Sequence, residues 1–136
     1  MSPLLVDSSV WIDAFNGRST VEVGLLNDAL DAGEVVLGDL ILMEVLQGVR
    51  HPRQLRATEQ ALAAFPCRIL GGRERARSAA GNYRLLRAAG LTPRSPIDVL
   101  IATFCVEESH ELLALDRDFP AMIPHLGLVI RRPAVT

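Results

Sequence analysis

The sequence predicts an α/β fold in which a parallel sheet carries helices on both faces. Short apolar runs alternate with longer segments of helical periodicity, the pattern of repeated strand–helix–strand units. The chain has 136 residues, the length of one domain, and 49% of them are apolar. That share is enough to bury a core without disulfides or metal staples. We therefore expect a single domain over residues 1–136.

The short apolar runs are the expected strands, because a parallel strand buried on both faces reads as a continuous apolar segment. The first of them, Leu4-Leu5-Val6, ends directly at Asp7. The runs lie at residues 4–6, 35–37, 66–70, 112–115 and 126–130.

The segments between these runs have recognisable helix starts and stops. Ser8 is expected to cap the first helix and Asp39 a nearly all-apolar buried helix, and Gly33 and Gly90 end two others. The expected helices cover residues 8–15, 21–31, 40–48, 53–64, 74–89 and 96–108.

The basic residues exclude several kinds of site. All 14 are arginine, so the chain has no lysine for a P-loop or for Schiff-base chemistry. Cys67 and Cys105 are far apart and form no CxxC pair, which excludes a disulfide framework and a zinc site of that type. The N-terminus lacks a basic region before its apolar run, and no apolar run is long enough for a bilayer. We expect a soluble, cytoplasmic protein with no membrane partner.

The net charge of −2 hides a strong asymmetry. Residues 50–94 contain ten arginines and two acids, a balance of +8, whereas the rest of the chain contains four arginines and 14 acids, a balance of −10. This distribution indicates either solvated helix faces, the ordinary reason for such runs, or a polyanion partner beside an acidic site.

Four acids stand in apolar surroundings. Asp7 and Asp116 each follow an expected strand, and in a parallel sheet the carboxyl ends of the strands share one rim. Asp7, Asp98 and Asp116 also have ordinary interpretations as helix or turn caps, Asp98 within the capping-box-like run Ser95-Pro96-Ile97-Asp98. Glu44 lies in the second turn of its helix, where no cap role exists.

Several carboxylates in one site repel one another, and a hard divalent cation is the usual remedy. A carboxylate set without His or Cys suits Mg²⁺ or Mn²⁺ and not zinc. Such ions activate water and stabilise charge on a phosphodiester, and neighbouring arginines would hold the nucleic-acid backbone. Acidic site and basic segment together favour a metal-dependent nuclease. On the first helix, Trp11 and Phe15 favour core packing or a dimer contact over base stacking.

Four segments resemble the motifs of PIN-domain proteins, specifically the VapC toxins of VapBC toxin–antitoxin pairs. They occur in the order of that family and span essentially the whole chain. The segments are 6–13 (VDSSVWID), 44–48 (EVLQG), 98–102 (DVLIA) and 112–119 (LLALDRDF).

The resemblance implies a three-layer α/β/α fold with a central five-stranded parallel sheet. It implies an Mg²⁺- or Mn²⁺-dependent endoribonuclease, a homodimer and inhibition by a VapB-like antitoxin. Carried over by motif, the acidic cluster that holds the metal is Asp7, Glu44, Asp98 and Asp116, with Asp118 a less certain fifth acid and Ser9 a hydrogen-bonding support. The candidates for RNA-backbone contacts are Arg73, Arg77, Arg84 and Arg87.

Two other interpretations stay open. The first is a phosphatase of the haloacid dehalogenase type, which also has an Asp after its first strand. That family has the motif DxDx(T/V) there and uses a lysine, whereas this chain has Asp7-Ser8-Ser9-Val10 and no lysine. The second is a catalytically silent PIN module that binds RNA or a protein partner, against which the four acids argue.

Overall fold

A parallel sheet of four strands forms the centre of the protein. The computed structural model describes residues 2–115 and 117–134, and its strands have the order β3-β2-β1-β4. β1 lies in the middle, where Leu5 pairs with Val36 on one side and with Leu112 on the other. The strands are β1 (Leu4–Val6), β2 (Val35–Gly38), β3 (Cys67–Arg68) and β4 (Glu111–Leu113).

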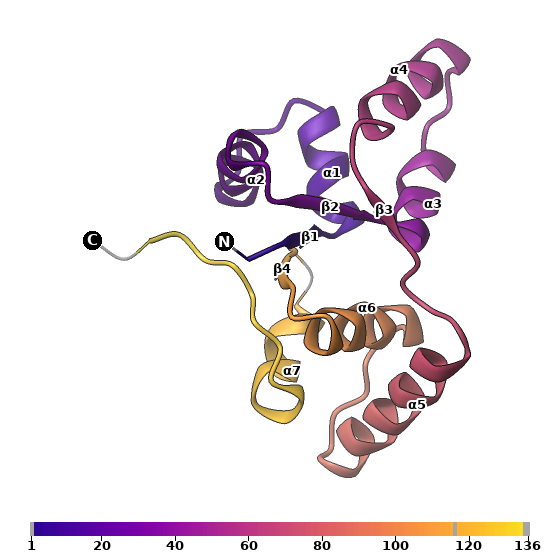
Figure 1. The fold of residues 1–136 in the computed structure, drawn as a ribbon, viewed down its shortest axis with the longest axis vertical. Helices are drawn as coiled ribbons and strands as arrows, with labels where there is room; N and C mark the ends of the chain where they lie inside the picture. Colours follow the sequence, from indigo (N-terminus) through magenta and orange to yellow (C-terminus); the bar gives the residue numbers. More distant parts are fainter. Residues whose placement is uncertain (1, 116, 135–136) are drawn as a thin grey trace.

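Helices cover both faces of this sheet, as the sequence predicts. Figure 1 shows α1 to α4 on one side of the strands and α5 to α7 on the other. The arrangement confirms a three-layer α/β/α fold. The helices are α1 (Ser8–Phe15), α2 (Val21–Ala32), α3 (Asp39–Gln47), α4 (Pro52–Leu62), α5 (Arg73–Ala88), α6 (Pro96–Glu107) and α7 (Asp118–Leu126).

The expected fifth strand at residues 126–130 is wrong for the part of the chain that the structure describes. A helix, α7, occupies residues up to Leu126 and ends at Gly127, which has a φ of 77°. The chain then touches the sheet at one parallel bridge between Ile130 and Leu112. Pro120 and Pro124 make the segment of α7 difficult to recognise as a helix from the sequence. Pro120 lies in the first turn, where a proline costs the helix no hydrogen bond, and Pro124 lies inside the helix.

Two further expectations need correction. The third strand is confined to Cys67–Arg68, shorter than the apolar run around it. Asp39 is the first residue of α3 and not its cap, since Gly38 holds the cap position. The Asp39 carboxylate instead accepts hydrogen bonds from the backbone N–H groups of Leu40 (2.8 Å) and Leu70 (3.0 Å), so it fixes the segment that follows β3. None of the described helices has the length and apolarity needed to cross a membrane.

Candidate functional site

Asp7 lies where β1 ends and α1 begins, and it serves both elements. Its backbone is extended (φ −68°, ψ 156°), and its side chain caps α1 by accepting from the N–H of Ser9 at 3.4 Å. The Asp7 N–H donates to the carbonyl of Leu113 at the end of β4, at 2.9 Å. The side chain is buried, with 6% of the residue exposed. The cap of α1 is therefore Asp7, as one interpretation of the sequence held, and not Ser8, which is the first residue of the helix. A carboxylate that caps a helix can still serve a second role.

Ser9 connects this carboxylate to the neighbouring strand. Its hydroxyl donates to Oδ2 of Asp7 at 2.8 Å and accepts from the N–H of Leu115 at 3.4 Å. Leu115 belongs to the segment that follows β4, so the carboxyl ends of β1 and β4 meet here as the topology predicts. The next residue, Asp116, lies outside the described residues, and its predicted place in the cluster stays a prediction.

Glu44 approaches Asp7 from the second turn of α3. The pKa of Glu44 is raised above its ordinary value, first by burial of its carboxyl group and then by the negative charge of Asp7. A hydrogen bond from Ser8 acts in the opposite direction. The Oε1 atom of Glu44 is buried and has no hydrogen-bond partner within residues 2–115 and 117–134. Because α1 packs against α3, two acids distant in sequence share one corner, in which Asp7 is buried and Glu44 is partly buried.

Asp98 lies in the first turn of α6, and the start of that helix is built as the sequence predicts. The Ser95 hydroxyl accepts from the N–H of Ile97 at 3.1 Å, and Pro96 occupies the first helical position. Asp98 is partly buried. Within the described residues no group of three or more acids, histidines and cysteines has the geometry of a metal site. The described structure thus brings Asp7 and Glu44 together, and the full cluster of four stays a prediction.

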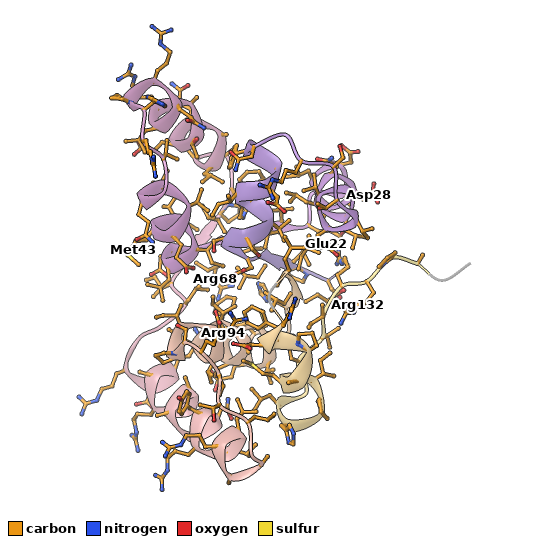
Figure 2. The ribbon with its side chains drawn as sticks, turned by 180° about the vertical axis from the view of Figure 1, so that it is seen from behind. Glu22, Asp28, Met43, Arg68, Arg94 and Arg132 are labelled. Atoms are coloured by element: carbon orange, nitrogen blue, oxygen red, sulfur yellow. The ribbon has the colours of Figure 1, made fainter. Side chains whose placement is uncertain are left out.

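Asp118 is engaged in a different contact. Its Oδ2 accepts from the backbone N–H of Arg94 at 3.1 Å and lies 3.5 Å from Nε of the same residue. Arg94, labelled in Figure 2, directly precedes the Ser95 cap of α6. Asp118 therefore connects the start of α7 to the turn before α6, the helix that contains Asp98. The sequence pattern did not indicate this contact.

The arginines of α5 divide between two faces of the helix. Arg75 is turned inward, where it binds Glu108 at 2.6 Å and lies over the ring of Phe104. The four candidates for RNA contacts are all exposed, and Figure 2 shows guanidinium groups reaching from this helix into solvent. They are Arg73, Arg77, Arg84 and Arg87. A phosphate backbone can reach this outer face without breaking an internal contact of Arg75.

A hard cation fits the chemistry of the Asp7–Glu44 corner. A buried carboxylate oxygen without a hydrogen donor is costly, and a second carboxylate nearby increases the cost. Oxygen-only ligands are those that Mg²⁺ prefers. An ion held there would satisfy the Glu44 oxygen and counteract both the burial and the repulsion by Asp7 that raise the pKa of Glu44.

The sequence model of the PIN domain matches residues 4–122. The chain belongs to the PIN-domain family. This match runs from β1 into the first half of α7 and so includes Asp7, Glu44, Asp98 and Asp118.

Among the curated relatives, Ribonuclease VapC11 of Mycobacterium tuberculosis is 28% identical over 118 residues, which are 85% of this chain and 88% of that protein. The DNA-bound VapBC complex from Salmonella typhimurium contains a chain with a TM-score of 0.72 at 20% identity, covering 96% of this chain and 98% of that one. VapC20 of Mycobacterium tuberculosis, described as a sarcin-ricin loop cleaving toxin, has a TM-score of 0.66 at 19% identity and covers 96% and 99%. The two structural similarities establish the fold.

Proposed function

We propose that this PIN-domain protein is a metal-dependent endoribonuclease, the toxin of a type II toxin–antitoxin system. The observation that carries the proposal is the pair of Asp7 and Glu44 at the carboxyl end of the sheet, where the Oε1 atom of Glu44 is buried without a hydrogen-bond partner among the described residues. The names of the VapC relatives support ribonuclease activity. The VapBC complexes among the structural neighbours support a VapB-like antitoxin as partner.

The residues divide among three tasks in this proposal: holding the metal, orienting one of its ligands and binding the RNA backbone. Asp7, Glu44, Asp98 and Asp116 would hold Mg²⁺ or Mn²⁺, which when bound activates water and stabilises charge on the phosphodiester. Ser9 keeps the Asp7 carboxylate oriented through its 2.8 Å hydrogen bond. The exposed arginines of α5 bind phosphates and position the RNA without reading its sequence. Because RNA is the substrate, we infer that the protein acts in the cytoplasm, and we infer a homodimer from the resemblance to VapC toxins.

RNA cleavage by the purified full-length protein tests this proposal. A labelled RNA should be cut with Mg²⁺ or Mn²⁺ and stay intact with EDTA. Asp98→Asn should abolish cleavage, and Asp28→Asn should not, because Asp28 is an exposed acid of α2 (Figure 2). Cleavage that survives in Asp98→Asn would identify a contaminating nuclease or a different site. Absence of cleavage in the native protein would favour the silent PIN module.

Growth of an expressing culture gives a second test. Expression of the native chain should arrest growth, and Asp7→Ala should relieve the arrest while the protein accumulates. Equal arrest by both proteins would contradict a role for the carboxylate in toxicity.

A further inference from the structure

A pocket of about 240 Å³ lies between α1, α3 and α4, the first two of which also carry residues of the acidic corner. We propose that this pocket binds an unpaired nucleobase of the RNA, next to the scissile phosphate. The inference rests on the proposed function and adds a site for substrate recognition to it. Six lining residues carry the argument: Ile12, Phe15, Asn16, Arg50, His51 and Gln54.

The lining combines a flat apolar surface with a polar rim. Phe15 and Ile12 come from α1 and are 37% and 39% exposed, although both side chains are apolar. Asn16 and Gln54 also line the pocket, and each has a carboxamide with donors and an acceptor. A nucleobase has the matching surfaces, since its faces stack on aromatic rings and its edges exchange hydrogen bonds with amides.

The charge at the rim favours a nucleotide over an uncharged ligand. Arg50 and His51, in the link between α3 and α4, line the pocket beside Gln54. This link begins the arginine-rich segment of residues 50–94. A guanidinium beside a stacking surface serves the phosphate of the same nucleotide.

The position of the pocket connects it to the acidic corner. Two helices lead from one to the other: α1 from Ser8 to Ile12 and Phe15, and α3 from Glu44 to Gly48. These steps equal one to two helical turns, or about 6–11 Å along the axes. Successive nucleotides of a stacked strand lie about 3.4 Å apart, so the pocket is within reach of nucleotides near the cleavage site.

A larger cavity of about 470 Å³ between α5 and α6 provides a contrast. It is lined mostly by small and apolar side chains, among them Ala76, Ala79 and Val99. That lining offers few groups for the edge of a base. Tyr83 and Arg84 also line the larger cavity, so an aromatic ring and an arginine are common to both. The smaller pocket adds two carboxamide residues, Asn16 and Gln54, which suit the edge of a base.

Binding of short RNAs tests the proposal in the Asp98→Asn protein, in which the bound RNA stays intact. Fluorescein-labelled hexamers of adenosine, cytidine and uridine, and an abasic hexamer of equal charge, are titrated by fluorescence anisotropy. Trp11 is the only tryptophan of the chain and stacks on Phe15, with ring centroids 6.0 Å apart. We expect base-containing hexamers to quench Trp11 fluorescence and the abasic hexamer to leave it unchanged.

Variants of the pocket locate the base. Phe15→Leu keeps apolar bulk and removes the aromatic face, so the dissociation constant for a base-containing hexamer should rise about 5- to 100-fold. The abasic hexamer should bind both proteins equally. Gln54→Leu should change the order of preference among the three bases, whereas Gln60→Leu, an exposed position of α4 outside the pocket, should not.

The outcomes separate the two proposals. If no hexamer binds the Asp98→Asn protein, with or without a change in the pocket, the proposed function itself is contradicted. Binding that is equal for abasic and base-containing RNA, and unchanged by Phe15→Leu, would overturn the base pocket and leave the nuclease standing. Quenching of Trp11 by a synthetic amphipathic helical peptide, with none by RNA, would assign the pocket to a protein partner and overturn the inference.

Discussion

Acidic side chains gather at both ends of the same parallel sheet, but the pKa of a carboxyl group is lowered at one end and raised at the other. At the amino end, Arg131 lies between Glu34 and Glu111, with N–O distances of 3.0 Å to each. Its hydrogen bond to Glu111 lowers the pKa of that carboxyl, the largest of several effects. At the carboxyl end, burial and Asp7 raise the pKa of Glu44.

The comparison teaches how a structural cluster differs from a binding site. At the amino end the chain supplies its own cation, and charge is neutralised within the fold. At the carboxyl end the Glu44 oxygen is buried without a donor among the described residues. A buried carboxylate oxygen without a donor destabilises the folded protein, and a ligand that binds this oxygen would remove the destabilisation.

The largest difference between the two ends should appear in catalysis. Glu44→Gln should slow RNA cleavage by about 100-fold or more, because it removes one carboxylate from the proposed metal site. Glu111→Gln, the same change at the other end, should leave the rate unchanged. Initial rates on a labelled RNA at saturating Mg²⁺ measure both. An equal loss in both variants would mean that the two ends are not functionally distinct.

Metal binding should stabilise the protein through the carboxyl end alone. With Mg²⁺ at 100 times its dissociation constant, the free energy of unfolding should rise by about 2.7 kcal/mol. Asp7→Asn should remove most of this increase, and Arg131→Ala should preserve it. Urea unfolding with Mg²⁺ and with EDTA gives the values. Mg²⁺ stabilisation that persists in Asp7→Asn would place the ion elsewhere.

Loss of the internal cation should destabilise the amino end. Arg131→Ala leaves two partly buried carboxylates facing each other, and we expect a loss of about 2 kcal/mol in the free energy of unfolding. Arg132→Ala is the matched control, since Arg132 is exposed and adjacent (Figure 2). Urea unfolding in EDTA compares them. Similar losses in the two variants would show that the ion pairs of Arg131 contribute little.

The smallest expected effect is a dependence of the free energy of unfolding on pH in the acid range. The pKa of Glu111 is lower in the folded protein than its ordinary value of 4.5. Its stabilising contribution is therefore present above pH 4.5 and is lost as the pH falls through the lowered pKa. Glu111→Gln should flatten the acid side of a plot of unfolding free energy against pH. An acid side that is equally steep in the variant would contradict this role.

Local signals made much of the fold predictable. The bounds of α1 agree with the expected 8–15, because Asp7 caps its start and Asn16-Gly17 follow its end. The start of α6 was predicted equally well from Ser95 and Pro96. The helix α7 was not predicted, because Pro120 and Pro124 masked the helical periodicity. The predicted fifth strand is reduced to a bridge between Ile130 and Leu112, because only tertiary contact decides whether residues near Ile130 pair with β4.

Of the two aromatic residues of α1, the core packing predicted from the sequence is confirmed for one, and the alternative of a dimer contact stays a prediction for the other. Trp11 is buried and packs against Phe65, as a core residue should. Phe15 is 37% exposed at the edge of a pocket formed by three helices. Its helical spacing resembles that of a core residue, and the neighbours that create the pocket come from residues 45–58.

The sequence by itself determined which carboxylates stand in apolar surroundings, because strand runs, caps and helical periods are local patterns. It also placed Asp7 at the carboxyl rim of the sheet. Only the tertiary structure decided which acids find a cation within the chain. Arg131 reaches Glu34 across 97 residues and Glu111 across 20, and Arg94 binds Asp118 across 24. Glu44 is left beside Asp7, because charge pairing depends on distances in space that no local pattern encodes.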